Sequence, residues 1–134
     1  MTTVGCILSL MVTPTILVVD DEPAVLLTYS MILRQNGYDV TGVSTAREAK
    51  AVLEERRFDL LVCDLALEGS HSGLEVLDFA RSRYSVIPAV LLTGYATREL
   101  AEVAERKRFT LLMKPIEVTD LLDSIAKLAR GRTA

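Results

Sequence analysis

Carboxylate, hydroxyl and amine side chains follow short apolar segments of the sequence. Asp20 and Asp21 come directly after ILVV, Asp64 follows LLVC, Thr93 follows VLL and Lys114 follows LLM. Carboxylates that lie close together do not all stay ionised without a partner, because their charges repel and one of them retains a proton. Oxygen ligands alone favour Mg²⁺ over Zn²⁺. If these segments end at one place in the fold, the sequence therefore predicts a magnesium site.

Magnesium keeps several waters and readily shares its ligand shell with phosphate, which indicates phosphoryl chemistry. In such a site Thr93 can donate a hydrogen bond to a phosphoryl oxygen, and Lys114 can neutralise another. Asp64 is then a plausible nucleophile that forms an aspartyl phosphate. Taken singly, each of these residues is more often a turn former, a helix cap or a solvated loop residue. The hypothesis depends on their combination at four strand ends.

The elements that position these residues alternate along the chain. Apolar, β-branched segments predict five strands, at 16–19, 38–43, 60–63, 86–92 and 109–113. Apolar spacing between and after them predicts five helices, with boundary signals at Pro23 and Gly37, Thr45 and Glu48, Ser72 and Glu75, Thr97 and Lys107, and finally Gly131. The alternation indicates strand–helix units without an internal repeat.

Nearly continuous apolar strands indicate a sheet that is covered on both faces. We therefore predict an α/β fold, a doubly wound five-stranded parallel sheet with helices on both faces and the flavodoxin-like strand order 2-1-3-4-5. Ligands bind such sheets beyond the carboxyl ends of the strands, where the candidate residues stand. Residues 14–131 are the expected domain, 1–13 an N-terminal extension that could be disordered, and 132–134 a tail.

Composition narrows the class of protein. The chain has 134 residues, which suits one domain, and its net charge of −3 disfavours nucleic acid as a partner. No apolar segment is long enough to cross a membrane. Cys6 and Cys63 show no disulfide or metal spacing, which favours a reducing compartment and a cytoplasmic location. The single histidine, His71, is interpreted as an exposed loop residue.

Four segments together resemble the response-regulator receiver domain. They are ILVVDDE at 16–22, LVCDLAL around Asp64, LLTGYA from Leu91 and MKP at 113–115, and the resemblance extends over about 14–131. It implies that a sensor histidine kinase or a histidine phosphotransfer protein transfers a phosphoryl group to Asp64. It also implies Mg²⁺-dependent self-phosphorylation and self-dephosphorylation in a signalling protein that is not a turnover enzyme.

The same resemblance implies a role for each matching residue. Asp21 and Asp64 would bind Mg²⁺, Asp20 would do so mostly through water, and the backbone carbonyl of Ala66 would complete the site. Lys114 would contact the phosphoryl group and precede a cis bond to Pro115. Thr93 would turn towards the phosphoryl group and thereby shift the chain from an inactive to an active surface.

The chain also departs from the pattern of the family. Glu68 stands where a proline is frequent, and Gly73 follows Asp64 by one residue more than is common. Leu111 occupies the usual position of a switch aromatic, so we hypothesise that coupling between Thr93 and an aromatic flip is absent. A further hypothesis is that Tyr95 shields the phosphoryl group from water.

The short chain leads us to expect a stand-alone receiver that signals by contact with a downstream protein through its fourth and fifth helices. Receiver domains often pair through this region, so a homodimer is a further option. One alternative is a pseudo-receiver scaffold that works without phosphorylation, which Leu111 and Glu68 support. Another is a small phosphohydrolase, although Ala66 stands where that class generally has a second catalytic acid.

Overall fold

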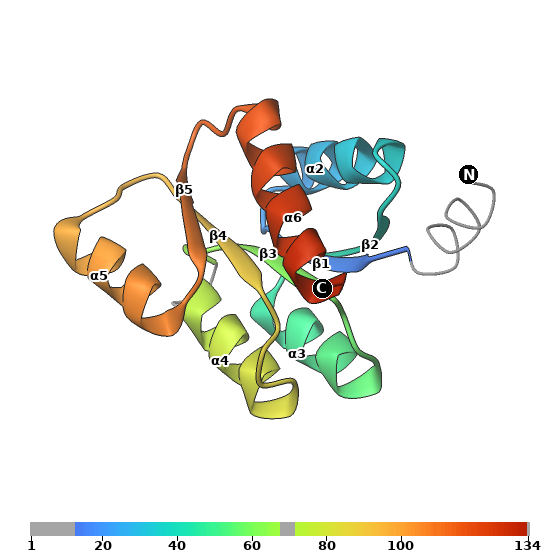
Figure 1. The fold of residues 1–134 in the computed structure, drawn as a ribbon, viewed down its shortest axis with the longest axis horizontal. Coiled ribbons are helices and arrows are strands. Elements are labelled where there is room, and N and C mark those ends of the chain that lie inside the picture. The colour runs from blue at the N-terminus through green and yellow to red at the C-terminus, as the bar shows by residue number, and fades with distance from the viewer. Residues whose placement is uncertain (1–12, 68–71, 134) are drawn as a thin grey trace.

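The computed structural model describes residues 13–67 and 72–133, in which five strands alternate with five helices (Figure 1). The strands form one parallel sheet in the order β2-β1-β3-β4-β5, which confirms the predicted fold and strand order. Their bounds are Thr15–Val19 for β1, Asp39–Val43 for β2, Leu60–Asp64 for β3, Ala89–Thr93 for β4 and Thr110–Met113 for β5.

The predicted start of the fourth strand is wrong. The apolar segment begins at Val86, but β4 begins at Ala89, and the side chain of Val86 is 74% exposed. Pro88, which immediately precedes the strand, has no N–H to donate to the ladder, although its carbonyl accepts a hydrogen bond from Leu61 N–H. Every residue of β3 and β4 is buried, as expected for central strands covered on both faces.

The helices are α2 (Pro23–Gln35), α3 (Ala46–Glu55), α4 (Gly73–Arg83), α5 (Arg98–Lys107) and α6 (Val118–Thr133). The capping box before α3 is confirmed, because Thr45 Oγ1 accepts the Glu48 N–H while the Glu48 carboxylate accepts the Ser44 N–H. Thr97 caps α5 by accepting the N–H three residues on, from Leu100, whereas Ser72 caps α4 by accepting the N–H two residues on, from Leu74. Gly37, with a φ of 93°, lies just beyond the end of α2.

The predicted end of the last helix is also wrong. Gly131 was expected to stop it, but α6 continues to Thr133 and includes part of the expected tail. A glycine inside a helix costs only about 1 kcal/mol relative to alanine, which does not by itself end a helix. Leu121 and Ile125 are fully buried, so packing of α6 on the sheet outweighs that cost.

The sheet lies between two layers of helices (Figure 1) and separates two clusters of buried apolar side chains. Helices α3, α4 and α5 cover one face, where Leu53, Leu77 and Ala104 pack against Leu61 and Leu91. Helices α2 and α6 lie on the opposite face. The buried residues of the core there are Ile16, Val18, Leu33, Val40, Leu60, Val62, Val90, Leu92, Leu121 and Ile125. With both faces covered, the carboxyl edge of the strands is the open part of the sheet.

At the other edge of the sheet, the side chain of Arg81 on α4 joins two connections. It donates hydrogen bonds to the backbone carbonyls of Ile87, Lys107 and Arg108. Ile87 precedes β4, while Lys107 ends α5 and Arg108 leads from it towards β5, so one guanidinium contacts the entry of both strands. Across the described helices, no stretch combines the length and the apolar composition that a membrane span requires.

Candidate functional site

Three carboxylates meet at the carboxyl edge of the sheet. Asp20 and Asp21 follow β1 and Asp64 ends β3, and because these strands are parallel neighbours their carboxyl ends lie side by side. One carboxylate oxygen from each residue lies within 4.8 Å of the others. The side chains are enclosed to different degrees, since Asp20 is 1% exposed, Asp64 is 5% exposed and Asp21 is half-buried. The structure thus brings together the three predicted acids.

Asp20 has one satisfied and one unsatisfied carboxylate oxygen. Its Oδ1 accepts the backbone N–H of Glu22 at 2.9 Å, whereas its buried Oδ2 has no hydrogen-bond partner within the described part of the chain. Burial raises the pKa of Asp20, and the nearby charges of Asp64 and Asp21 raise it further, against the hydrogen bond from Glu22 and the charge of Lys114. A buried oxygen in this state favours a bound proton or cation.

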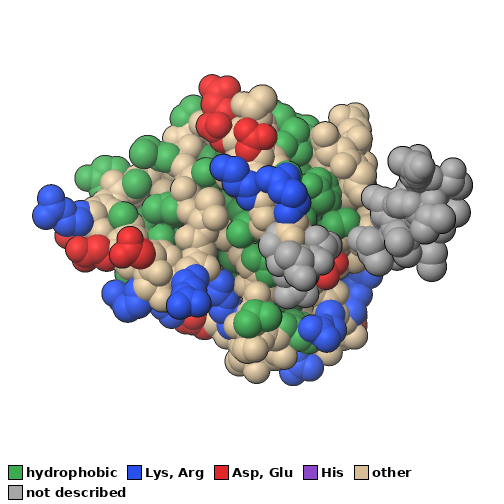
Figure 2. Space-filling view, in the orientation of Figure 1, with side chains coloured by type: hydrophobic (Ala, Val, Ile, Leu, Met, Phe, Trp, Pro, Cys, Tyr) green, Lys and Arg blue, Asp and Glu red, His purple; other side chains and the backbone are tan. Residues whose placement is uncertain are grey.

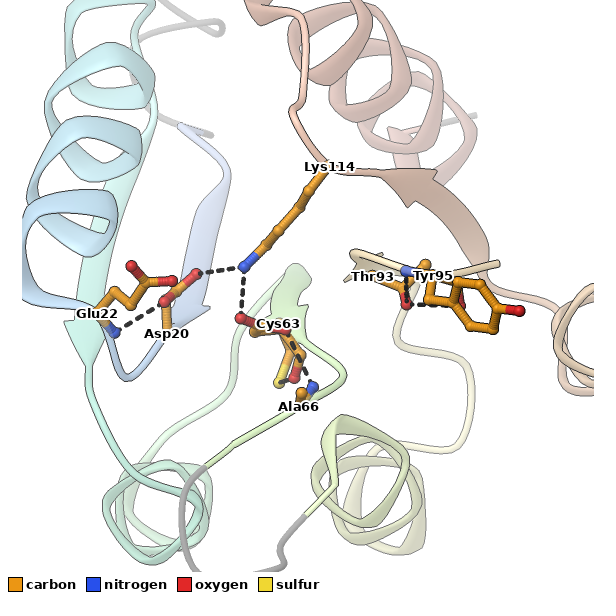
Figure 3. A network of polar contacts seen from close by, with 8 residues as sticks. Asp20, Glu22, Cys63, Ala66, Thr93, Tyr95 and Lys114 are labelled. Atoms are coloured by element: carbon orange, nitrogen blue, oxygen red, sulfur yellow. Dashed lines mark hydrogen bonds and ion pairs between the residues drawn. The ribbon is translucent and has the colours of Figure 1, made fainter. Parts of the chain in front are cut away.

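Lys114 supplies a positive charge to this cluster from the end of β5 (Figure 3). Its Nζ donates a hydrogen bond of 2.6 Å to Asp64 Oδ2 and lies 3.8 Å from Asp20 Oδ2. Burial alone would lower the pKa of Lys114, but the hydrogen bond and charge of Asp64, together with the charge of Asp20, leave it raised. The ammonium is therefore held in its charged form. The predicted cis bond between Lys114 and Pro115 is confirmed.

The turn after β3 donates a backbone hydrogen bond to the Asp64 carboxylate. Asp64 Oδ1 accepts the backbone N–H of Ala66 at 3.0 Å, so both oxygens of this side chain have partners. Gly73, at the start of α4, packs directly on the backbone here, and its N–H donates to the Leu65 carbonyl. A Cβ at Gly73 would lie 2.5 Å from the Asp64 carbonyl oxygen. Sequence reasoning used Gly73 only as a spacing marker and missed this close approach.

Thr93 lies at the same sheet edge, but its hydroxyl is hydrogen-bonded to the backbone of Tyr95 and not to the acids. Its Oγ1 accepts the Tyr95 N–H at 3.1 Å and donates to the Tyr95 carbonyl at 3.2 Å. Among the described residues, no side-chain hydrogen bond joins Thr93 to Asp64 or Lys114; the link to Lys114 is a backbone one, from Lys114 N–H to the Thr93 carbonyl. The structure therefore places Thr93 near the cluster without bringing its hydroxyl into contact with the acids.

The ring of Tyr95 is 80% exposed and points away from Lys114 and Cys63 (Figure 3). It therefore does not cover the carboxylates in this conformation, and its predicted shielding role stays a prediction. Leu111 is half-buried, pairs with Leu91 in the sheet and packs against the α3–α4–α5 core. Cys63 is buried, as expected, and burial raises the pKa of its thiol. Glu68, His71 and the extension up to residue 12 lie outside the described residues.

The acids fit a divalent cation on the chemistry of their donors. Three carboxylates from two adjacent strand ends converge, and Asp20 Oδ2 is a buried acceptor without a hydrogen bond in the described chain. Hard oxygen ligands of this kind suit Mg²⁺, which usually binds through one or two carboxylates and several waters. Ala66, on the turn that follows Asp64, is an exposed residue. The cluster can therefore hold a metal ion next to Asp64.

Comparison with known protein sequences identifies the family that the four sequence segments resemble. The family model of the response regulator receiver domain matches residues 16–126. Response regulator protein FleR of Pseudomonas aeruginosa is 32% identical over 118 residues, which make up 87% of this chain and 25% of FleR. Nitrogen assimilation regulatory protein NtrX of Azorhizobium caulinodans is 33% identical over 109 residues, or 80% of this chain and 24% of NtrX. The chain spans about a quarter of the length of these relatives.

Solved structures show the same fold. A CheY-like response regulator receiver domain protein from Methanospirillum hungatei matches with a TM-score of 0.83 and 30% identity, covering 90% of this chain and 97% of that one. A response regulator receiver protein from Sinorhizobium medicae matches with a TM-score of 0.82 and 28% identity, covering 91% and 98%. The family match over most of the sequence and the shared fold lead to one conclusion. This chain belongs to the response regulator receiver domain family of two-component signalling.

Proposed function

We propose that Asp64 accepts a phosphoryl group from a sensor histidine kinase or a histidine phosphotransfer protein. Mg²⁺ would be held by Asp20, Asp21, Asp64 and the backbone carbonyl of Ala66. The observation that carries the proposal is the contact of 2.6 Å between Lys114 Nζ and Asp64 Oδ2 beside the unsatisfied Asp20 Oδ2. This contact supports the proposal because it brings the Asp64 carboxylate, the Lys114 ammonium and a buried carboxylate oxygen of Asp20 together at one edge of the sheet.

In the proposed transfer, a carboxylate oxygen of Asp64 attacks the phosphorus of the donor and forms a new O–P bond. The bond between phosphorus and the donor breaks, and its electron pair stays on the leaving nitrogen or oxygen of the donor. Bound Mg²⁺ supplies positive charge that offsets the negative charge of the phosphoryl oxygens. Lys114, whose ammonium contacts the Asp64 carboxylate, would then donate its hydrogen bond to a phosphoryl oxygen instead.

Thr93 is proposed to signal that transfer. Its hydroxyl would exchange the Tyr95 carbonyl for a phosphoryl oxygen. The turn that carries Tyr95 would follow, because the Tyr95 N–H donates to the same hydroxyl. The affected surface lies at the carboxyl ends of β4 and β5, next to α5 and α6. We propose that a downstream protein, or a second copy of the chain, binds there.

A cytoplasmic location belongs to the same proposal, because Cys63 is a free buried thiol of the kind found in reducing compartments.

A phosphorylation assay tests the proposal. The protein is incubated with acetyl phosphate and Mg²⁺, and the intact mass is recorded. We expect one added phosphoryl group, which Asp64→Asn abolishes and which the exposed Asp123→Asn retains. Modification that persists in Asp64→Asn would contradict the assignment of the acceptor. Absence of any modification in the wild-type chain would instead support a scaffold that works without phosphorylation, and rapid multiple turnover would support a hydrolase.

A further inference from the structure

A surface pocket of about 320 Å³ lies at the amino edge of the sheet, at the entries of β4 and β5 and away from the carboxylates. We call it the Arg81 pocket. Four basic residues and a short segment before β4 line it: Arg81, Arg106, Lys107 and Arg108, with Ser85, Val86 and Pro88. Among the residues that the structure describes, no Asp or Glu lines this pocket. Figure 2 shows basic side chains gathered at this end of α5.

Most of the positive charge in the Arg81 pocket is not neutralised by an acid. Lys107 is paired with Asp78 at 2.9 Å, whereas Arg106 and Arg108 are exposed and form no ion pair within the described chain. Arg81 donates its hydrogen bonds to backbone carbonyls. Burial lowers the pKa of Arg81, although the charge of Asp78 acts in the opposite direction. A bound anion would therefore stabilise several cations at once.

The end of a helix explains only part of this cluster. Cations in the last turn interact favourably with the helix dipole, which accounts for Arg106 and Lys107 in α5. Arg108 comes after the helix and has a φ of 58° and a ψ of 59°, in the left-handed region where glycine is usual. Among the described residues it is the only non-glycine residue with a positive φ. The backbone at this position thus favours a residue without a side chain, yet the chain places a guanidinium there.

The Arg81 pocket also has an apolar side. Val86 is 74% exposed, and Pro88 is half-buried beside it at the entry of β4. The exposed Ser85 adds a hydroxyl to the same lining. Cations, one hydroxyl and two apolar residues together suit a ligand that carries a compact anionic group and an apolar ring.

Phosphate is the anion that these donors match best. The planar guanidinium group binds phosphate oxygens in pairs, and a phosphate monoester carries nearly two negative charges and three acceptor oxygens. The volume of the pocket lies near the lower end of the range for small-molecule sites, which is about 300–1,000 Å³. Glu102 and Glu105 are exposed on α5 within about one turn of Arg106 and would repel an extended polyanion. A small molecule therefore fits better than nucleic acid or an anionic membrane.

We propose that the Arg81 pocket binds a small organic phosphate. Its phosphate group contacts Arg106 and Arg108, and its ring packs on Val86 and Pro88. A mononucleotide has this chemistry. The site lies at the opposite end of the strands from Asp64, so the proposal is independent of the phosphorylation of that residue.

Amide shifts in NMR spectra of the full chain locate the binding. The protein is titrated with adenosine monophosphate, inorganic phosphate and adenosine, with EDTA present so that no metal ion occupies the carboxyl edge. We expect adenosine monophosphate to shift the amides of Ser85, Val86 and Phe109 and to leave those of Asp20 and Asp64 in place. Inorganic phosphate should bind about tenfold more weakly because it has no ring to pack on Val86, and adenosine should not bind.

Substitutions at the two unpaired arginines test which side chains bind the phosphate. Arg106→Gln and Arg108→Gln should each weaken the binding of adenosine monophosphate about tenfold, as the loss of a charge-assisted hydrogen bond does. Arg98→Gln removes the same charge from the exposed start of α5 and should leave the affinity unchanged. Arg108→Gly is the second variant, because glycine suits the backbone there. It should unfold at a higher urea concentration than wild type and still bind more weakly.

Four results would overturn the proposal. The first is the absence of shifts at Ser85 and Val86 at millimolar nucleotide, and the second is shifts confined to the carboxyl edge. The third is equal affinity for inorganic phosphate and adenosine monophosphate, which would mean that the pocket recognises an anion without a ring. The fourth is displacement of the nucleotide by a hexaglutamate peptide at a lower concentration than phosphate requires, which would indicate an acidic protein segment as the partner.

Discussion

Lys114 Nζ and Asp64 Oδ2 lie 2.6 Å apart, so the ammonium that follows β5 donates a hydrogen bond to the carboxylate at the end of β3. The same ammonium lies 3.8 Å from Asp20 Oδ2 and partly neutralises a cluster of three acids. A divalent cation that enters this cluster must therefore compete with a charge that already belongs to the chain. This competition gives the first prediction.

Lys114→Met should bind Mg²⁺ more tightly than the wild-type chain. Loss of the ammonium removes repulsion at short range and frees Asp64 Oδ2, so we expect an increase in affinity of about tenfold. Calorimetric titration with MgCl₂ measures it. Lys127→Met removes the same charge from the exposed face of α6 and should leave the affinity unchanged. Weaker binding by Lys114→Met would show that the ammonium orders the acids more than it repels the ion.

Asp20→Asn should stabilise the fold at neutral pH when Mg²⁺ is absent. The carboxylate of Asp20 is buried, and its raised pKa means that the folded state holds the charged form at a cost. We expect a gain of about 1 kcal/mol in the free energy of unfolding, measured with urea. Because a raised acid pKa costs stability above the unfolded pKa, the gain should shrink as the pH falls through the folded pKa of Asp20. Millimolar Mg²⁺ should stabilise the wild-type chain and not the variant.

Gly73→Ala should destabilise the chain by about 1–3 kcal/mol, the usual cost of overpacking. The new Cβ would lie 2.5 Å from the Asp64 carbonyl oxygen, so the turn after β3 or the start of α4 has to move. Urea unfolding measures the loss. Gly94→Ala is the matched control, since a Cβ there meets no atom within 4 Å. Equal stability of Gly73→Ala and wild type would mean that the turn adjusts without cost.

The capping box of α3 should make part of the stability depend on pH. Hydrogen bonds from the backbone and side chain of Ser44, with one from Thr45, lower the pKa of Glu48 below its usual range. A lowered acid pKa stabilises the fold above the unfolded pKa, and this contribution is lost as the pH falls through the folded pKa. Glu48→Gln should therefore be less stable than wild type at neutral pH and equal to it in acid. Glu102→Gln, on the exposed face of α5, serves as the control in the same urea series.

Much of the architecture could be predicted because the local signals agree with the tertiary packing. The segments ILVV and LLVC are apolar at every position, and only a strand buried on both faces suits them, so β1 and β3 were predicted within one residue. The start of the fourth strand was predicted too early, at Val86, because the apolar residues before Pro88 resemble strand residues. The backbone joins the sheet only at Ala89. The end of the last helix was predicted too early, at Gly131, because a local glycine signal does not include the packing of α6 on the sheet. The helix continues to Thr133.

In the candidate site, too, some features could be predicted from the sequence and others could not. Strand ends determine where Asp20, Asp64 and Lys114 lie, so their proximity follows from topology and could be predicted. The direction of the Thr93 hydroxyl could not, because it depends on a hydrogen bond within the turn to Tyr95 that competes with any contact to the acids. The close approach of Gly73 to the Asp64 carbonyl also depends on the three-dimensional path of the turn.

The three carbonyl contacts of Arg81 give the sheet a mechanical asymmetry. They clamp the entries of β4 and β5 at the edge opposite the carboxylates, where the guanidinium holds Ile87, Lys107 and Arg108 together. At the carboxyl edge, one backbone hydrogen bond joins Lys114 N–H to the Thr93 carbonyl, while the side chains of these two residues bind Asp64 and Tyr95 respectively. The groups that would rearrange on phosphorylation of Asp64 therefore lie at the opposite end of these two strands from Arg81, which holds their entries in a fixed relation to each other.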